Sequence, residues 1–176
     1  MSNRTYLHFG AASLAVGLAT FSLIHGQQQP KKTYGSMTHQ HMDEMNKRGD
    51  KAMGFDHMKT THHFVLANDG GVIQVETNKS RDNESSGQIR QHLRHIAMMF
   101  SNGDFDTPMF VHAQDPPGVE VMKELKAEIS YRFEQTRRGG RVRIASTNPD
   151  AIKAIHDFLS FQIKEHMTGD PLEVVK

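Results

Sequence analysis

The chain has 176 residues, enough for one domain of about 100–150 residues with tails. Its 21 Lys and Arg residues nearly balance its 20 Asp and Glu residues, so the overall charge gives no reason to expect nucleic acid as a partner. Cysteine is absent, which excludes disulfides, iron–sulfur clusters, thiolate metal sites and a cysteine nucleophile. With 12 His and 11 Met, imidazole and thioether are the soft or borderline metal ligands that remain.

Residues 1–26 have the layout of a secretory signal peptide. Arg4 is the only charged residue before a weakly apolar run over residues 7–24, and Gly26 is a small residue suited to the last position before cleavage. An uncleaved membrane anchor is the alternative, although a run of about 18 residues is near the lower limit for a span. The segment therefore predicts export, giving a periplasmic or secreted protein.

A His/Met-rich linker is predicted over residues 27–60. It opens with polar residues and glycine, and His and Met then cluster between residues 37 and 58. Imidazole and thioether favour copper, and the thioether selects Cu(I). His57, near the end of this segment, is therefore a candidate metal ligand. The alternative is a short helix over residues 43–53 that packs its Met side chains on the core.

Two copies of a hairpin followed by a helix are predicted next, each with a Gly-Gly turn. In the first copy the strands cover residues 62–66 and 72–76, and the helix covers residues 85–100 with Ser85 or Ser86 as its cap. In the second copy the strands cover residues 131–134 and 142–144, and the helix covers residues 149–166 with Asn148 as its cap and Pro149 at its first position. A strand at residues 109–111 and a helix over residues 119–129 are predicted between the copies.

Superposing the two Gly-Gly turns indicates an internal repeat. The superposition pairs Phe64 with Phe133, Ile73 with Val142 and Val75 with Ile144, all apolar. Because antiparallel strands with one apolar face need helices to cover that face, the sequence predicts an α+β fold. Two ββα units would form a four-stranded antiparallel sheet with helices on one face, in a ferredoxin-like layering. The single domain would cover residues 61–170, followed by a tail over residues 171–176.

The histidines of these units are candidate metal ligands. Because side chains alternate along a strand, the superposed turns place His62 inward and His63 outward. On the first helix, His92 and His95 are three residues apart and Met99 follows one turn later, so all three lie beside the apolar stripe. On the last helix, His156 lies within that stripe. The candidate set is His57, His62, His63, His92, His95, Met99 and His156, with His112 and His166 as further candidates.

Several motifs resemble those of an uncharacterised family of small exported bacterial proteins. They include Met53-Gly54-Phe55, Thr60-Thr61-His62-His63-Phe64 and His92-Leu93-Arg94-His95-Ile96, and the resemblance extends over residues 48–170. It implies a single exported domain and carries no activity with it.

Three functions follow from these patterns as hypotheses. The first is an exported transition-metal protein, with copper as the first choice, for storage, delivery or resistance. The second is a periplasmic metalloenzyme in which histidines hold zinc, iron, copper or haem; such an enzyme needs a pocket and an open coordination position. The third is a metal-free module that binds a protein partner, or a second copy of itself, through the open face of the sheet.

Overall fold

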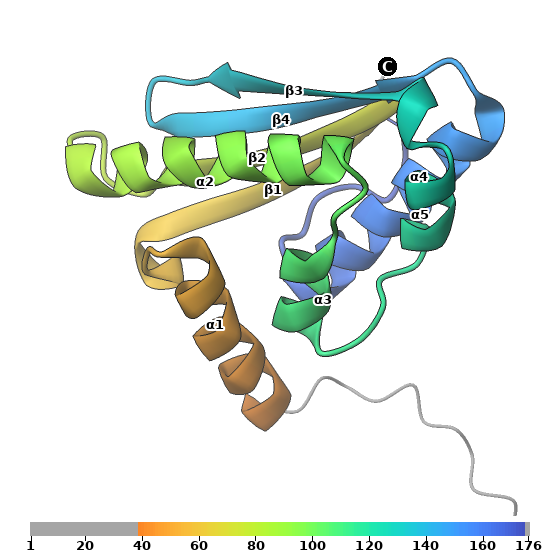
Figure 1. Cartoon of the computed structure of the whole chain (residues 1–176). Coiled ribbons are helices and arrows are strands. Elements are labelled where there is room, and N and C mark those ends of the chain that lie inside the picture. Colours follow the sequence, from red (N-terminus) through yellow and green to blue (C-terminus); the bar gives the residue numbers. More distant parts are fainter. Residues whose placement is uncertain (1–38, 175–176) are drawn as a thin grey trace, which may run out of the picture. The chain divides into compact units, whose positions relative to one another are not determined.

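The computed structural model describes residues 39–174, and the predicted signal peptide with the first part of the predicted linker lies outside them. Helices cover one face of a four-stranded antiparallel sheet with the order β1-β2-β4-β3, which confirms the predicted fold class (Figure 1). The strands are β1 (Thr60–Ala67), β2 (Gly70–Thr77), β3 (Ile129–Gln135) and β4 (Gly139–Ser146). The helices are α1 (His39–Met53), α2 (Asn83–Ser101), α3 (Asp106–His112), α4 (Val119–Glu124) and α5 (Pro149–Glu165), with short 3-10 turns η1 (His57–Lys59) and η2 (Lys126–Glu128). None of these helices is long and apolar enough to cross a membrane.

The pairing of the central strands β2 and β4 confirms the predicted repeat. Ile73 lies opposite Val142, its predicted equivalent. In the repeat, Gly71 is equivalent to Gly140 and Val75 is equivalent to Ile144. Gly71 lies opposite Ile144, and Val75 lies opposite Gly140, so the pairing is symmetric about Ile73 and Val142. The two hairpins are therefore related by a pseudo-twofold axis through the middle of the sheet. Of the paired apolar residues, Phe64, Ile73, Val75, Val142 and Ile144 are buried, and Phe133 is partly buried.

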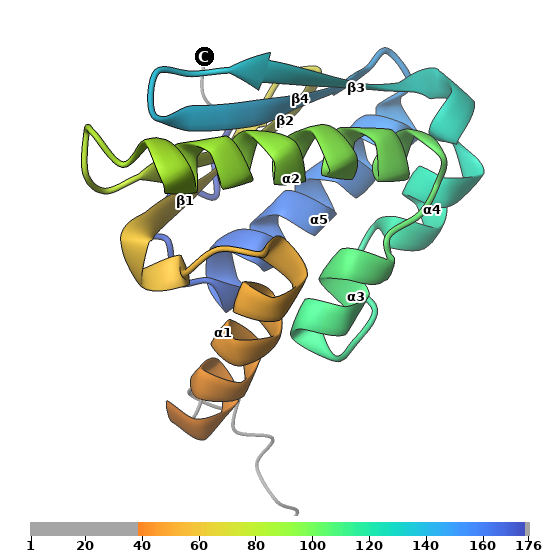
Figure 2. The ribbon, with the colours of Figure 1, turned by 60° about the vertical axis from the view of Figure 1, so that its left-hand side comes forward.

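Each main helix covers the hairpin of the other repeat. α2, which follows β2 in the chain, packs mainly on β3 and β4, whereas α5, which follows β4, packs on β1 and β2 (Figure 2). Arg90 on α2 fixes this arrangement. Its guanidinium donates hydrogen bonds to the carbonyl oxygens of Thr136, Arg137 and Gly139, around the β3–β4 turn. The core between the two layers is consequently shared by both repeats.

Three local predictions are wrong, each for an identifiable reason. Residues 109–111 are part of α3, because a short apolar run suits a buried helix as well as a strand. The helix predicted over residues 119–129 ends at Glu124, since η2 intervenes and β3 begins at Ile129. The cap of α2 is Asp82, whose carboxylate accepts a hydrogen bond from the Ser85 amide at 2.9 Å. The cap of α5 is Asn148 as predicted.

Helix α1 occupies residues that the sequence assigned to the linker. Met45 is 1% exposed, and Arg48 Nε donates a hydrogen bond to the carbonyl oxygen of Val111 at 2.8 Å. Phe55, just after the helix, is buried in the core. Residues 39–53 therefore match the alternative interpretation, a helix that packs its Met side chains on the domain.

The sheet face turned away from the helices is polar. Arg141 pairs with Glu134 at 2.7 Å across β3 and β4, and Arg143 pairs with Asp69. Among residues 39–174, the large apolar side chains that are exposed all lie outside the four strands. The open sheet face, which the sequence suggested as a surface for a protein partner, therefore carries ion pairs.

Candidate functional site

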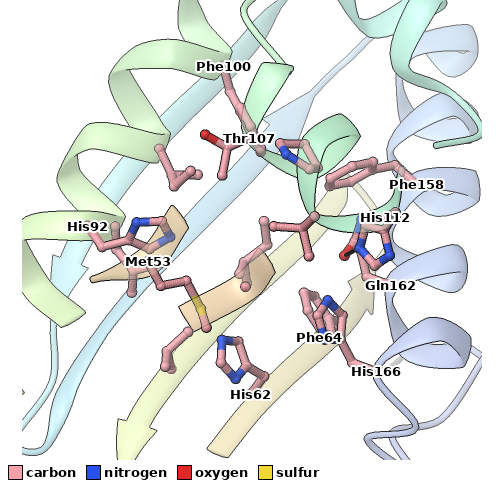
Figure 3. A pocket seen from close by; sticks show the side chains of 17 residues that line it. Met53, His62, Phe64, His92, Phe100, Thr107, His112, Phe158, Gln162 and His166 are labelled. Carbon is pink, nitrogen blue, oxygen red and sulfur yellow. Dashed lines mark hydrogen bonds between the residues drawn. The ribbon is translucent and has the colours of Figure 1, made fainter. Parts of the chain in front are cut away.

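Four histidines from different elements meet at a cavity between the sheet and the helices. His62 comes from β1, His92 from α2, His112 from the end of α3, and His166 directly follows α5 (Figure 3). We call this hollow the histidine cavity. Its volume is about 90 Å³, whereas a single water needs roughly 10–15 Å³. Apart from Thr107 and Gln162, the remaining lining is almost entirely apolar, and no charged side chain of the described residues takes part in it.

An outer groove opens onto two of the same histidines. It has a volume of about 310 Å³, and its rim includes Met45, His57 and Met167. Four residues line both the groove and the histidine cavity, and we call them the neck: Gly49, Met53, His62 and His166. The neck therefore places two imidazoles and one thioether between a surface groove and the mainly apolar histidine cavity.

The rings of His62 and His166 at the neck are nearly parallel, with 6° between their planes and 5.8 Å between their centres. Phe55 packs against His62 at 6.4 Å, and Phe64 packs against His166 at 5.5 Å. A metal bound about 2.0–2.1 Å from one nitrogen of each imidazole holds the two ring centres about 5–6 Å apart. The observed separation of the ring centres falls within this range. Neither ring has a hydrogen-bond partner in the part of the chain that the structure describes.

Burial keeps these imidazoles neutral. It lowers the pKa of His62 to about 4, with further contributions from the nearby His92, His57 and His63. Burial likewise lowers the pKa of His166 to about 3, reinforced by His62 and His112, and the pKa of His92 to about 4. A neutral imidazole keeps a nitrogen lone pair that can bind a metal, so no proton has to leave at neutral pH.

His112 forms a buried polar group with α5. Its Nε2 lies 2.9 Å from Gln162 Oε1, and its Nδ1 lies 3.7 Å from Glu165 Oε2, too far for a hydrogen bond. The atoms His112 Nδ1, Gln162 Nε2 and Glu165 Oε2 have no hydrogen-bond partner among the described residues. Burial lowers the pKa of His112, although Gln162 and Glu165 oppose the shift. Because buried polar groups normally have partners, this wall of the cavity is suited to a polar guest.

Of the candidates from the sequence, His62 and His92 reach the histidine cavity. His63 faces away from the helices, as predicted, with its Nδ1 2.9 Å from a carboxylate oxygen of Asp170. His95 shares a separate groove with His92 and Met53, on the exposed side of α2. His92 and His95 therefore line the same groove, as their spacing of three residues on a helix predicts.

Two other candidates lie elsewhere. His156 Nε2 lies 2.9 Å from the carbonyl oxygen of Ala67, so the ring is hydrogen-bonded outside the histidine cavity. Its predicted position was wrong because the equivalence of the two hairpins does not extend to the helices that follow them. Met99 packs against the core, with its sulfur 3.9 Å from the hydroxyl of Thr107.

His57 belongs to a group of possible metal ligands near the rim of the outer groove. Its Nδ1 lies 2.9 and 3.0 Å from the two carboxylate oxygens of Asp50. Together with Asp56, these residues form the only set of three His, Cys, Asp or Glu ligand atoms within 4.8 Å of one another in residues 39–174. The same contacts also fasten the end of α1 to η1, since the His57 amide donates to Asp50 at 2.8 Å.

The sequence placed Met53 within the His/Met-rich segment but did not single it out as a candidate ligand. Met45, Gly49 and Met53 are spaced by four residues on α1 and line one side of the outer groove. That spacing is visible in the sequence, but it has meaning only once these residues are helical. His166 was recognised only as a further candidate, because a histidine at the end of a helix usually interacts with the helix dipole.

Comparison of the chain with protein-family models, with curated proteins and with solved structures gave no match. The functional argument therefore depends on the site itself.

Proposed function

We propose that the protein binds Cu(I) at the neck, through His62, His166 and the thioether of Met53, as an exported copper protein for storage, delivery or resistance. One observation carries the proposal. Two neutral imidazoles without hydrogen-bond partners in the described chain lie 5.8 Å apart beside a thioether, between a surface groove and an apolar cavity.

The donor set favours copper over the other ions considered. Thioether and imidazole together suit Cu(I), whereas magnesium and calcium prefer several carboxylate or carbonyl oxygens. No carboxylate among the described residues lines the histidine cavity. Sites for drug-sized ligands occupy about 300–1,000 Å³, so the histidine cavity of about 90 Å³ beside the neck is too small for haem.

The test is a Cu(I) titration of the full chain under anaerobic conditions, in competition with a chromophoric Cu(I) chelator. Met37, His39 and Met42 are first replaced by alanine, so that the His/Met-rich segment does not bind the metal itself. In this background, His62→Phe and His166→Phe remove the ligand nitrogens but keep an aromatic ring packed on Phe55 and Phe64. Changes in the surroundings of a metal ligand cost about 10–100-fold in affinity, so loss of a ligand should cost at least that.

Matched controls come from histidines outside the neck. His63→Phe changes the adjacent residue on the opposite face of the sheet, and His156→Phe changes another histidine associated with α5. Both should leave the Cu(I) affinity unchanged. Equal losses in the neck and control variants, or no loss in either, would contradict the proposal.

A further inference from the structure

The histidine cavity lies on the other side of the neck from the outer groove. Its wall includes Leu93, Phe100, Val111 and Phe158, and no charged side chain of the described chain reaches it. Such a lining disfavours ions and charged metabolites, because burying an unpaired charge in an apolar site is costly. A guest of this cavity has to be small and uncharged.

The cavity also offers a hydrogen-bond donor. Gln162 is 4% exposed and lines the cavity, and its Oε1 is held by His112. Its Nε2 has no partner among residues 39–174. A buried amide nitrogen without a partner is costly, so a guest with an acceptor atom would be stabilised there. An apolar cavity of about 150 Å³ takes up benzene, so the volume of about 90 Å³ suits a smaller molecule of a few heavy atoms.

We infer that Cu(I) at the neck takes a diatomic gas, of the class of O₂ and CO, as an additional ligand within the histidine cavity. This inference rests on the proposed function. His62, His166 and Met53 supply three ligands, and an ion held between the groove and the cavity keeps a coordination position open toward the interior. The bound gas lies among the apolar side chains, and its outer atom accepts a hydrogen bond from Gln162.

Carbon monoxide is the probe, because it binds Cu(I) without oxidising it and its stretching vibration reports its surroundings. The full chain is loaded with Cu(I), exposed to CO and examined by infrared spectroscopy. A single narrow C–O band is expected. Gln162→Leu should shift this band because the donor is removed and no new metal ligand is introduced, while the Cu(I) affinity stays the same.

Val111→Phe fills the cavity from α3 and should weaken CO binding at least 10-fold without changing the Cu(I) affinity. Val121→Phe is the matched control, since Val121 lies on α4 outside the cavity and is 36% exposed; it should behave as the parent does. Circular dichroism checks that both variants are folded. If Val111→Phe does not fold, Thr107→Leu fills the same cavity from the preceding turn of α3.

The outcomes separate this inference from the proposed function. A chain that binds Cu(I) at the neck but no CO, or binds CO equally well after the cavity is filled, overturns the inference and leaves the copper site standing. A chain that binds no Cu(I) overturns the proposed function. In that case xenon NMR of the metal-free chain still tests the cavity, and absence of xenon contacts with Val111 and Phe158 overturns its role as a gas pocket.

Discussion

His166, directly after α5, lies parallel to His62 on β1, with 5.8 Å between the ring centres. Within residues 39–174, no charged side chain lines the cavity that they share, and burial lowers the pKa of His166 to about 3 and that of His62 to about 4. The pair is therefore neutral over the whole physiological range of pH. That neutrality favours metal binding, and it also affects the stability of the metal-free protein.

We expect the metal-free protein to lose stability as the pH falls from about 6.5 toward 4. The unfolded chain protonates its histidines near pH 6.5, whereas the native pKa values of His62 and His166 lie near 4 and 3. The unfolded state then binds more protons, so the free energy of unfolding falls with pH by roughly 1.4 kcal/mol per pH unit for each such histidine. Above pH 6.5 this contribution is fully present. Urea denaturation at a series of pH values measures the slope.

The control for this prediction compares loss of a buried histidine with a change that removes no titratable group. His166→Phe should make the dependence shallower by one histidine, while Val121→Phe, on α4, should leave the slope unchanged. A slope equal in all three proteins would contradict the assignment.

The thioether of Met53 should set metal preference. Met53→Leu keeps the size of the side chain but removes the sulfur, so Cu(I) affinity should fall while Zn(II) affinity stays the same. Met99→Leu is the matched control, since Met99 packs near Thr107, outside the histidine cavity. Competition titrations with each metal measure both affinities. A parallel loss for copper and zinc would mean that Met53 acts through packing.

Partial filling of the histidine cavity should stabilise the protein. Val111→Ile places one more methylene in space that is already present, for a gain of up to about 0.8 kcal/mol. Val119→Ile makes the same change at a residue that is 1% exposed and lies outside the cavity, and overpacking there should cost about 1–3 kcal/mol. Chemical denaturation compares the two. Destabilisation of similar size in both variants would mean that the cavity cannot accept the added methyl.

Gly118 and Gly54 should differ in their tolerance of alanine. Both have positive φ, +84° and +76°, which costs about 1–2 kcal/mol for a residue with a Cβ. A Cβ at Gly118 would also overlap the Ala154 carbonyl of α5, whereas nothing lies within 4 Å of one at Gly54. Gly118→Ala should therefore lose about 1–3 kcal/mol more than Gly54→Ala in thermal or urea unfolding. Equal losses would mean that the positive φ alone sets the cost of alanine and that the contact with Ala154 adds nothing.

The hairpins were predictable because their signals are local. Gly-Gly turns flanked by alternating apolar residues set the strands and their register, and the alternation alone placed His62 inward and His63 outward. The cap at Asn148 was equally readable from its Asn-Pro-Asp context. These features depend on residues within about one turn of each other, so tertiary context had little power to change them.

The neck was harder to predict because its residues come together only through long-range packing. The repeat was extended from the hairpins into the helices, which placed His156 where Leu93 stands in the first copy. In the structure α5 packs on the opposite hairpin from α2, so His166 rather than His156 reaches the cavity. Met53 was assigned to a polar linker, so the helical spacing that directs its side chain inward was not used to place it.

The exchange of helices between the two hairpins has a consequence for the origin and assembly of the fold. A chain cut between α3 and α4 would give two fragments, each with a hairpin whose apolar face lacks its main covering helix. Neither should be stable alone, and mixing them should restore the domain by complementation. Two copies of one ββα unit could cover each other in the same way, as a domain-swapped dimer with true twofold symmetry. The protein has the architecture of such a dimer joined into a single chain. Tyr131 stands in the second hairpin where His62 stands in the first, so the described residues form one neck and not a symmetric pair.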